Sequence, residues 1–478
     1  MGYIQIEYGD EFFTVAVPVP LDEKGMVPVP TLADPFKAIK NSFEHPIESP
    51  PLREIVRSKI RRNPDAQAVI VVSDNTRPVP YKGRGGIIAP LLRTLIESGL
   101  KEDRIIVLIG CGSHRNMQQC EIEAMLGLNE AGFNVSVVNH EYDDEKMLVF
   151  VGRTKRGSPV KINRLYCKSD IKIVTGLVES HFMAGVSGGR KAICPGVAGK
   201  ETLQLFHGPE ILNSPNTADL VLDGNPCHEE ALQAAHLAGS DFSVNVTIDA
   251  ERRCTGVFSG DLEAAHNRAV GKILEYVVIA LEKRYDLVII PAGFVGVNHY
   301  QAAKAAIEAS RAVRPGGMII LVAQHRDPDP VGSSEYRKTL AMLKKHGPEK
   351  FLQIIMSPEW TFLHDQWETQ MWGKVIQSIG SELNLLYCAC EIPREDYCII
   401  PCKSGFEFYH ESEFQNEQGS KQIVKAMTSR AICFAIEKLR AEMGRDPGVL
   451  FLRDGPYGVP MVTEMMNEKK AYVKRRNA

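Results

Sequence analysis

Short runs of aliphatic and β-branched residues alternate with amphipathic segments through the first half of the chain. Residues 68–74 (AVIVVSD), 105–112 (IIVLIGCG) and 171–176 (IKIVTG) are such runs. Runs that are apolar throughout indicate strands buried on both faces, as in a parallel sheet. Between them, residues 89–100 and 121–132 have helical periodicity, with a glycine near the end where helices commonly stop. This order predicts an α/β fold.

Strict alternation of apolar and polar positions predicts two β-hairpins. One spans residues 3–18 (YIQIEYGDEFFTVAVP) around Gly9, and the other spans residues 242–261. Residues 262–285 are predicted to form one long helix that joins two domains. We therefore place the domain boundary near residue 275.

The second half of the chain contains a clear βαβ unit. Residues 285–324 give a strand, a loop, an alanine-rich helix, a Pro-Gly-Gly break and a second strand. Residues 384–390, 397–401 and 449–454 are further predicted strands, and residues 423–444 a further helix. We thus predict two α/β domains, residues 1–275 with the hairpins and residues 276–478. Each would have a mainly parallel sheet flanked by helices, and a return of residues 464–478 to the first domain stays open.

Composition and charge bear on the partners and the location of the protein. The chain has 478 residues, of which 44% are apolar and 24% charged, and its net charge of -3 gives no basic field for nucleic acid. The acidic and polar N-terminus does not resemble a signal peptide, and the apolar runs fall short of the roughly 18–20 residues that cross a bilayer. Eleven cysteines without paired CxxC motifs fit a reducing compartment. We expect a cytoplasmic protein without a nucleic-acid or membrane partner.

Polar side chains follow each predicted strand of the first domain, where open α/β sheets bind ligands. The set consists of Asp74, Asn75, Thr76 and Arg77 after the first strand, His114 after the second, and His181 after the third. In the second domain, Tyr300, Gln301 and Lys304 begin the helix after a strand, where backbone N–H groups attract anions.

Each of these groups also has a purely structural interpretation. Asp74 and Asn75 can form an Asx-type turn before Pro78. Gln301 can complete a capping box with Asn298, and His207 can satisfy the end of a helix.

The segment 185–191 (GVSGGRK) has the composition of an anion-binding loop. Gly188 and Gly189 permit close backbone approach, while Arg190 and Lys191 supply positive charge, so a nucleotide phosphate fits. The segment lacks the glycine before lysine that a Walker A loop needs, and Arg115 replaces the third glycine of a dinucleotide fingerprint. Neither an ordinary ATP site nor an ordinary NAD site is predicted.

Six segments together resemble the lactate racemase family, whose members carry a nickel-pincer nucleotide. They are DNTRP, GSHR, SHFMAGVSGGRK, LFH, HYQAAK and DQWE, between about residues 68 and 370. Their order and spacing match: His181 precedes Lys191 by ten residues, and His207 follows it by sixteen.

The resemblance implies an isomerase that inverts C2 of a 2-hydroxy acid, lactate or a larger one, by proton-coupled hydride transfer through a 2-keto acid. Its cofactor is a pyridinium mononucleotide whose carbon and two sulfur atoms grip Ni(II). By position, Lys191 is the covalent attachment point, His207 is the nickel ligand, and His114 and His181 are the acid/base pair. Imidazole suits nickel, and histidine suits proton transfer near neutral pH.

The resemblance further implies a site in an interdomain cleft, between a catalytic first domain and a second domain that closes over it. It assigns the cofactor to Asp74, Asn75, Thr76, Arg77, Gly188, Gly189, Arg190, Gln301 and Lys304, and the substrate to Arg77, Tyr300, Gln301, Lys304 and Trp367. Trp367 has the alternative of a core aromatic on an amphipathic helix. The implied partners are the hydroxy acid, proteins that build the cofactor, and a second copy of the chain in a homo-oligomer.

Two other functions stay open. Lys191 could form a Schiff base in a lyase or transferase, which the neighbouring glycines and arginine would tolerate. The chain could also store or deliver the nickel-pincer nucleotide without catalysis.

Overall fold

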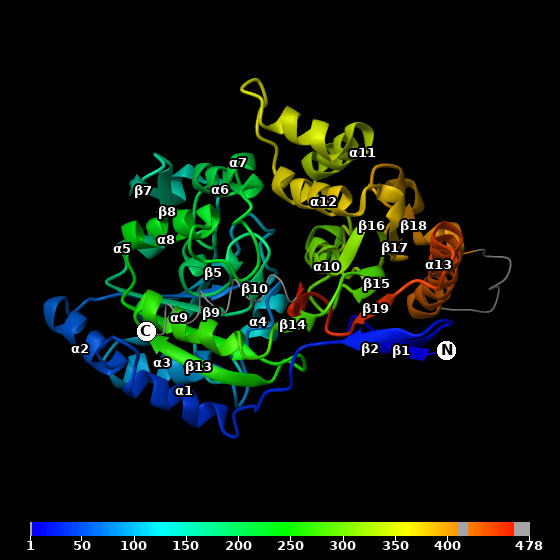
Figure 1. Cartoon of the computed structure of the whole chain (residues 1–478). Coiled ribbons are helices and arrows are strands. Elements are labelled where there is room, and N and C mark those ends of the chain that lie inside the picture. Colours follow the sequence, from blue (N-terminus) through cyan, green and yellow to red (C-terminus); the bar gives the residue numbers. More distant parts are fainter. Residues whose placement is uncertain (1, 410–418, 463–478) are drawn as a thin grey trace. The chain divides into compact units, whose positions relative to one another are not determined.

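The computed structural model describes residues 2–409 and 419–462, and these form two compact units (Figure 1). One unit is the continuous segment 28–276. The other combines residues 1–27 with the segment from residue 277 onward. The α/β class predicted from the sequence is confirmed in both units.

Unit 28–276 is built on a six-stranded sheet in the order β13-β12-β9-β4-β5-β6, in which only β13 is antiparallel to its neighbour. Its strands are β4 (Ala68–Ser73), β5 (Ile105–Gly110), β6 (Ser136–Asn139), β9 (Ile171–Leu177), β12 (Phe242–Ile248) and β13 (Cys254–Gly260). β4, β5 and β9 are buried along nearly their whole length, as their apolar runs predict.

Helices and small hairpins surround this sheet. The helices are α1 (Pro35–Glu44), α2 (Leu52–Arg62), α3 (Ile88–Glu97), α4 (Gln119–Leu126), α5 (Arg164–Lys168), α6 (Lys200–Phe206), α7 (Pro209–Asn213), α8 (Pro226–Ala238) and α9 (Leu262–Ile273). The paired strands outside the main sheet are β7 (Leu148–Arg153) with β8 (Pro159–Asn163), and β10 (Ser180–His181) with β11 (Gly185–Val186). The apolar faces of α1 to α4 share one core with the sheet.

The other unit has a fully parallel sheet in the order β18-β17-β16-β15-β19-β3. Its strands are β3 (Leu21–Lys24), β15 (Tyr285–Pro291), β16 (Val313–Val322), β17 (Leu385–Cys388), β18 (Lys403–Ser404) and β19 (Val449–Leu452). Its helices are α10 (His299–Ala312), α11 (Ser334–Ile355), α12 (Gln366–Ile379) and α13 (Ser420–Met443). In Figure 1, α10 and α12 lie on one side of β15 and β16, and α13 lies on the other.

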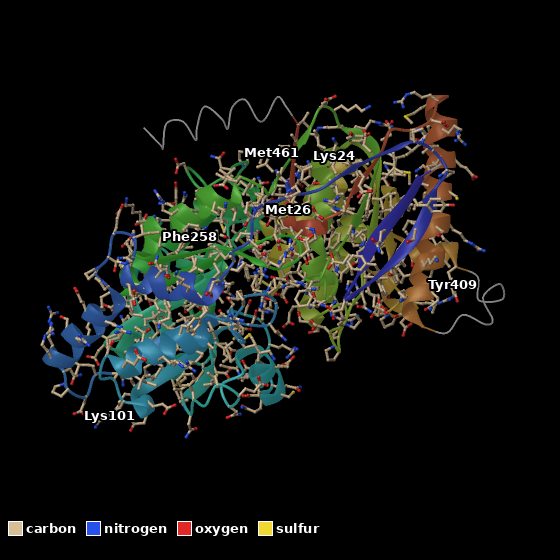
Figure 2. All side chains as sticks on the ribbon, turned by 90° about the horizontal axis from the view of Figure 1, so that it is seen from below. Lys24, Met26, Lys101, Phe258, Tyr409 and Met461 are labelled. Carbon is tan, nitrogen blue, oxygen red and sulfur yellow. The ribbon has the colours of Figure 1, made fainter. Side chains whose placement is uncertain are left out.

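The first residues of the chain belong to this second unit, which differs from the predicted boundaries 1–275 and 276–478. The hairpin of β1 (Gly2–Tyr8) and β2 (Glu11–Val17) forms as predicted, but its apolar face packs with α13 and the parallel sheet. β3 pairs with β19, so Lys24 lies opposite Leu452, and Met26 approaches Gly458. Figure 2 labels Lys24 and Met26 on this segment. Alternation predicts an apolar face but does not say which sheet covers it.

Three predicted elements need correction. The helix predicted over 262–285 ends as α9 at Ile273, because residues 278–281 form β14, which pairs with β20 (Val459–Val462) far along the chain. The helix predicted to reach residue 132 ends at Gly127, whose φ of 58° is left-handed. Residues 397–401 are not a strand but part of a 3₁₀ turn and loop. Residues 464–478, whose return to the first domain was left open, lie outside the described residues.

Among the helices within residues 2–409 and 419–462, none combines the length and apolar composition needed to span a bilayer.

Candidate functional site

Asp74 and His114 meet beyond the carboxyl ends of the neighbouring strands β4 and β5. His114 Nδ1 lies 2.7 Å from Asp74 Oδ2, and the carboxylate is almost fully buried. Burial acts to raise the pKa of Asp74, but the charge and hydrogen bond of His114, with help from Thr76 and Arg77, lower it to about 2. The charged carboxylate can only accept a hydrogen bond, so Nδ1 of His114 carries the proton and donates it. The neutral ring of His114 therefore has no proton on Nε2.

The rest of the loop after β4 braces this pair. Thr76 donates from both its backbone N–H and its hydroxyl to Asp74 Oδ1, which is the Asx-type turn considered from the sequence. Asn75 is exposed and donates to Glu121. The loop therefore has a structural role, and its binding role stays a prediction.

Arg77 joins this loop to the segment that follows β9. Its Nε lies 3.1 Å from Glu179 Oε1, and both side chains are largely buried. Sequence reasoning did not single out Glu179, although an acidic residue two positions before His181 at a strand end was a usable signal. The ion pair ties together the segments that carry Asp74 and His181.

His181 is the last residue of β10 and pairs with Gly185, the first residue of β11, across a tight turn. Its Nδ1 accepts hydrogen bonds from the backbone N–H groups of Met183 and Ala184, each at 3.2 Å. A nitrogen that accepts two N–H groups carries no proton, so the neutral ring holds its proton on Nε2. His114 and His181 are thus held in opposite tautomers.

The glycines of segment 188–191 are used for packing within the unit. Gly188 and Gly189 have φ values of 75° and 51°, and a side chain on Gly189 would meet the ring of His266 within 3.0 Å. Arg190 is buried and donates to the carbonyl groups of Ala184 and Gly188. Lys191 is half-buried in the 3₁₀ turn Gly189–Ala192. Contact of these four residues with a cofactor stays a prediction.

His207 caps the C-terminus of α6, as the structural interpretation expects. It is buried, and its Nδ1 lies 3.1 Å from the carbonyl oxygen of Leu203. Since a carbonyl can only accept, Nδ1 donates and the neutral ring keeps no proton on Nε2. Metal-binding histidines are commonly oriented through such a bond to a backbone carbonyl.

The remaining predicted residues lie in the other unit, on α10 and α12. Asn298 caps α10 by accepting from the backbone N–H of Gln301, and the buried Gln301 Oε1 has no hydrogen-bond partner among the described residues. Lys304 follows one turn later and is half-buried. Trp367 is 1% exposed and donates from Nε1 to the Tyr300 hydroxyl at 2.6 Å. It is therefore a core aromatic that also orients Tyr300.

Within the part of the chain that the structure describes, no group of three or more histidine, cysteine or acidic side chains is arranged to hold a metal ion.

Comparison with known proteins identifies the family to which the chain belongs. The model of the lactate racemase N-terminal domain matches residues 8–219, and that of the C-terminal domain matches residues 282–381. The lactate racemase of Lactiplantibacillus plantarum is 32% identical over 342 residues, which cover 71% of this chain and 77% of the relative. This chain belongs to the lactate racemase family. The family resemblance of the six sequence segments is thereby confirmed.

A second family member, the lactate racemase of Thermoanaerobacterium thermosaccharolyticum, is 29% identical over 386 residues, or 79% of this chain and 86% of that one. As a member of this family the chain is a racemase, an enzyme of the isomerase class.

Solved structures share the fold. The lactate racemase apoprotein from T. thermosaccharolyticum superposes with a TM-score of 0.76 at 23% identity, over 96% of this chain and all of that one. A protein from Thermotoga maritima matches with a TM-score of 0.59 at 20% identity, over 87% of this chain and all of that one.

Proposed function

We propose that this racemase inverts C2 of a 2-hydroxy acid with a nickel-pincer nucleotide as hydride acceptor, and that it acts in the cytoplasm. The proposal rests on the opposite tautomers of two imidazoles. His114 donates from Nδ1 to a buried carboxylate, whereas His181 accepts at Nδ1 from two backbone N–H groups. Inversion of a carbinol carbon needs one proton acceptor and one proton donor on its two sides. The substrate class, 2-hydroxy acids, is inferred from the relatives, which are lactate racemases.

His114 removes the hydroxyl proton of one enantiomer in this proposal. Its Nε2 is the unprotonated nitrogen, and the Asp74 carboxylate stabilises the imidazolium that forms when Nε2 takes the proton. Loss of the hydroxyl proton promotes departure of the C2 hydrogen as hydride and leaves a planar 2-keto acid.

The Nε2–H of His181 is the donor on the other side: it gives a hydrogen bond to the oxygen of the keto acid when the hydride returns to the opposite face. The proton that this oxygen takes up is the one held by the His114 imidazolium. The two bonds of His181 to Met183 and Ala184 N–H fix its ring plane, so its Nε2–H has a defined direction. In the reverse reaction the same proton and hydride transfers run in the opposite order.

The residues present fit the nickel-pincer nucleotide. His207 has an unprotonated Nε2 and a bond from Nδ1 to a carbonyl, as a metal ligand needs, and a single protein ligand suffices when the cofactor supplies three. The Lys191 amine would carry the covalent link, and the loop of Asp74 to Arg77 with Gly188 to Arg190 would line the nucleotide. When bound, the cofactor supplies the hydride acceptor.

Tyr300, Gln301, Lys304 and Trp367 would bind the substrate carboxylate and the cofactor from the other unit. The buried and unpartnered Gln301 Oε1 supports a polar ligand at the start of α10. We further propose that dedicated proteins build the cofactor and that the chain forms a homo-oligomer.

The test is incubation of cofactor-loaded protein with single-enantiomer 2-hydroxy acids, including lactate, aromatic, dicarboxylic and sugar acids, followed by chiral chromatography. We expect inversion of at least one acid, with loss of inversion but retention of nickel in His114→Ala and His181→Ala. Binding of metal and nucleotide without inversion of any acid would indicate a carrier, and borohydride trapping of substrate on Lys191 would indicate a Schiff-base enzyme.

Two further variants test the cofactor assignments directly. His207→Ala should lose nickel, whereas His236→Ala, an exposed histidine paired with Glu263, should keep it. Lys191→Ala should lose the mass increment of the covalent cofactor in intact-protein mass spectrometry. Retention of nickel by His207→Ala would contradict the ligand assignment.

A further inference from the structure

Arg190 is a guanidinium buried without a carboxylate partner. Its exposed fraction is 1%, and among the described residues no carboxylate pairs with it and no group bonds to its Nε. Nη2 donates to the carbonyl oxygen of Ala184 at 2.8 Å, and Nη1 to that of Gly188 at 3.4 Å. Nη1 also lies 3.1 Å from Nε2 of His266 on α9. Burial lowers the pKa of Arg190 only to about 10, so it stays charged at neutral pH.

The carbonyl that Arg190 holds belongs to the turn that sets His181. Ala184 contributes one of the two N–H groups that bond to His181 Nδ1. The other carbonyls of this turn are held too: Asn225 Nδ2 donates to Met183, and the N–H of Leu220 donates to Gly185. The turn is thus fixed at three consecutive carbonyl groups. Of their three donors, Arg190 is the charged one.

We propose that Arg190 is a positioning residue that holds the 183–185 turn so that His181 keeps its proton on Nε2. The proposal rests on the proposed role of His181 in racemisation. By bonding the carbonyl oxygen of Ala184, Arg190 fixes the 184–185 peptide group. This group adjoins the 183–184 peptide group, whose N–H bonds to His181 Nδ1 and whose carbonyl Asn225 holds. Through its bond to Gly188, the same guanidinium joins this turn to the segment that carries Lys191.

A role in fold stability alone does not explain Arg190. A charge buried without a counter-ion costs free energy that a methionine of similar length avoids. Two carbonyl groups can be satisfied by neutral donors at lower cost. The guanidinium instead supplies strong hydrogen bonds in a fixed fork, which suits the precise placement of a peptide group.

The test compares Arg190→Met and Arg190→Lys with wild type in two measurements. In apoprotein labelled with ¹⁵N-histidine, ring-nitrogen NMR of wild type should show His181, identified by its loss in His181→Gln, with Nδ1 unprotonated and Nε2 protonated. In Arg190→Met the two nitrogens should move toward an average of both tautomers. In loaded enzyme, kcat should fall about 10- to 100-fold while KM changes less than about threefold.

The matched control is Arg153→Met, an exposed arginine of the same unit that also donates to a backbone carbonyl, that of Gly157. It should leave both measurements unchanged. Arg190→Lys keeps the charge and one donor direction, so its kcat should lie between those of wild type and Arg190→Met. If Arg190→Met does not fold, Arg190→Lys must by itself show the fall in kcat without a matching rise in KM.

An unchanged His181 spectrum in a folded Arg190 variant would overturn the proposal, as would an unchanged kcat. The NMR measurement needs neither cofactor nor substrate. A wild-type protein that racemises no hydroxy acid would therefore refute the proposed function while leaving the positioning role of Arg190 to be judged by the spectrum.

Discussion

Asp74 determines which nitrogen of His114 can act on a substrate. The 2.7 Å bond to a carboxylate of low pKa places the proton on Nδ1, and the two bonds from Thr76 keep the carboxylate in that position. Without the carboxylate, both neutral tautomers of the ring become accessible and the imidazolium loses its counter-charge.

Asp74→Asn should therefore lower kcat by a factor of about 10² to 10⁴, because the amide can donate to Nδ1 and favour the tautomer with a protonated Nε2. Steady-state racemisation assays measure this fall. Asp65→Asn is the control, since Asp65 is an exposed carboxylate paired with Arg104, and it should retain full activity. Equal activity of Asp74→Asn and wild type would exclude the assigned role.

Asp74 also makes stability depend on pH. Its pKa falls from an ordinary value near 3.8 to about 2 in the folded protein, so folding favours the charged carboxylate. The contribution, about 2 kcal/mol, is present in full above about pH 4 and is lost as pH falls through about 2. The difference in unfolding free energy between wild type and Asp74→Asn, measured with urea, should shrink by this amount from pH 6 to pH 2. A constant difference would contradict the assignment.

At the scale of elements, the short β10–β11 hairpin positions His181 and depends on Gly185. This residue has a φ of 78°, and a Cβ there would lie 2.1 Å from the backbone oxygen of Val221. Because the obstacle is backbone rather than a flexible side chain, neither strain nor clash can be relieved locally.

Gly185→Ala should consequently lower the unfolding free energy by at least about 2 kcal/mol. The control is Gly271→Ala on α9, where a Cβ meets nothing within 4 Å and the helix gains about 0.5–1 kcal/mol. Urea unfolding of both variants gives the comparison. A Gly185→Ala protein as stable as wild type would show that the turn has room to adjust.

At the scale of the whole molecule, residues 2–27 and the described residues after 276 belong to the same unit. β3 lies at the edge of the sheet beside β19, and the β1–β2 hairpin shares a core with that sheet and α13. Residues 28–276 interrupt this unit as one continuous insertion with a core of their own. The two units therefore differ in what they need to fold.

A fragment of residues 28–276 should fold alone, whereas residues 277–478 should not, because loss of residues 1–27 exposes both an apolar face and the edge of β19. Joining residues 1–27 to residue 277 through a flexible linker should restore folding. Near-UV circular dichroism and cooperative thermal unfolding of the three fragments check this. A cooperatively folded 277–478 fragment without the first residues would contradict it.

Much of the fold and part of the site follow from local sequence pattern. The apolar runs at β4, β5 and β9 identify buried strands, and the rule that parallel strands end at one edge predicts that Asp74 and His114 lie at the same edge, where the structure brings them into contact. The six family segments identify the racemase. Such features depend on a few neighbouring residues and on burial of both strand faces, so the sequence is sufficient for them.

Only the tertiary structure decided features that depend on residues far apart in the chain. Residues 278–281 have an apolar pattern that suits a helix or a strand, and their pairing with β20 makes them a strand. The burial of Arg190 beside His266 of α9 likewise cannot be predicted from its position after two glycines. The tautomer of His114 depends on Asp74, which lies on another loop. Sequence pattern sets which groups must be buried or bonded, while packing across long separations chooses their partners.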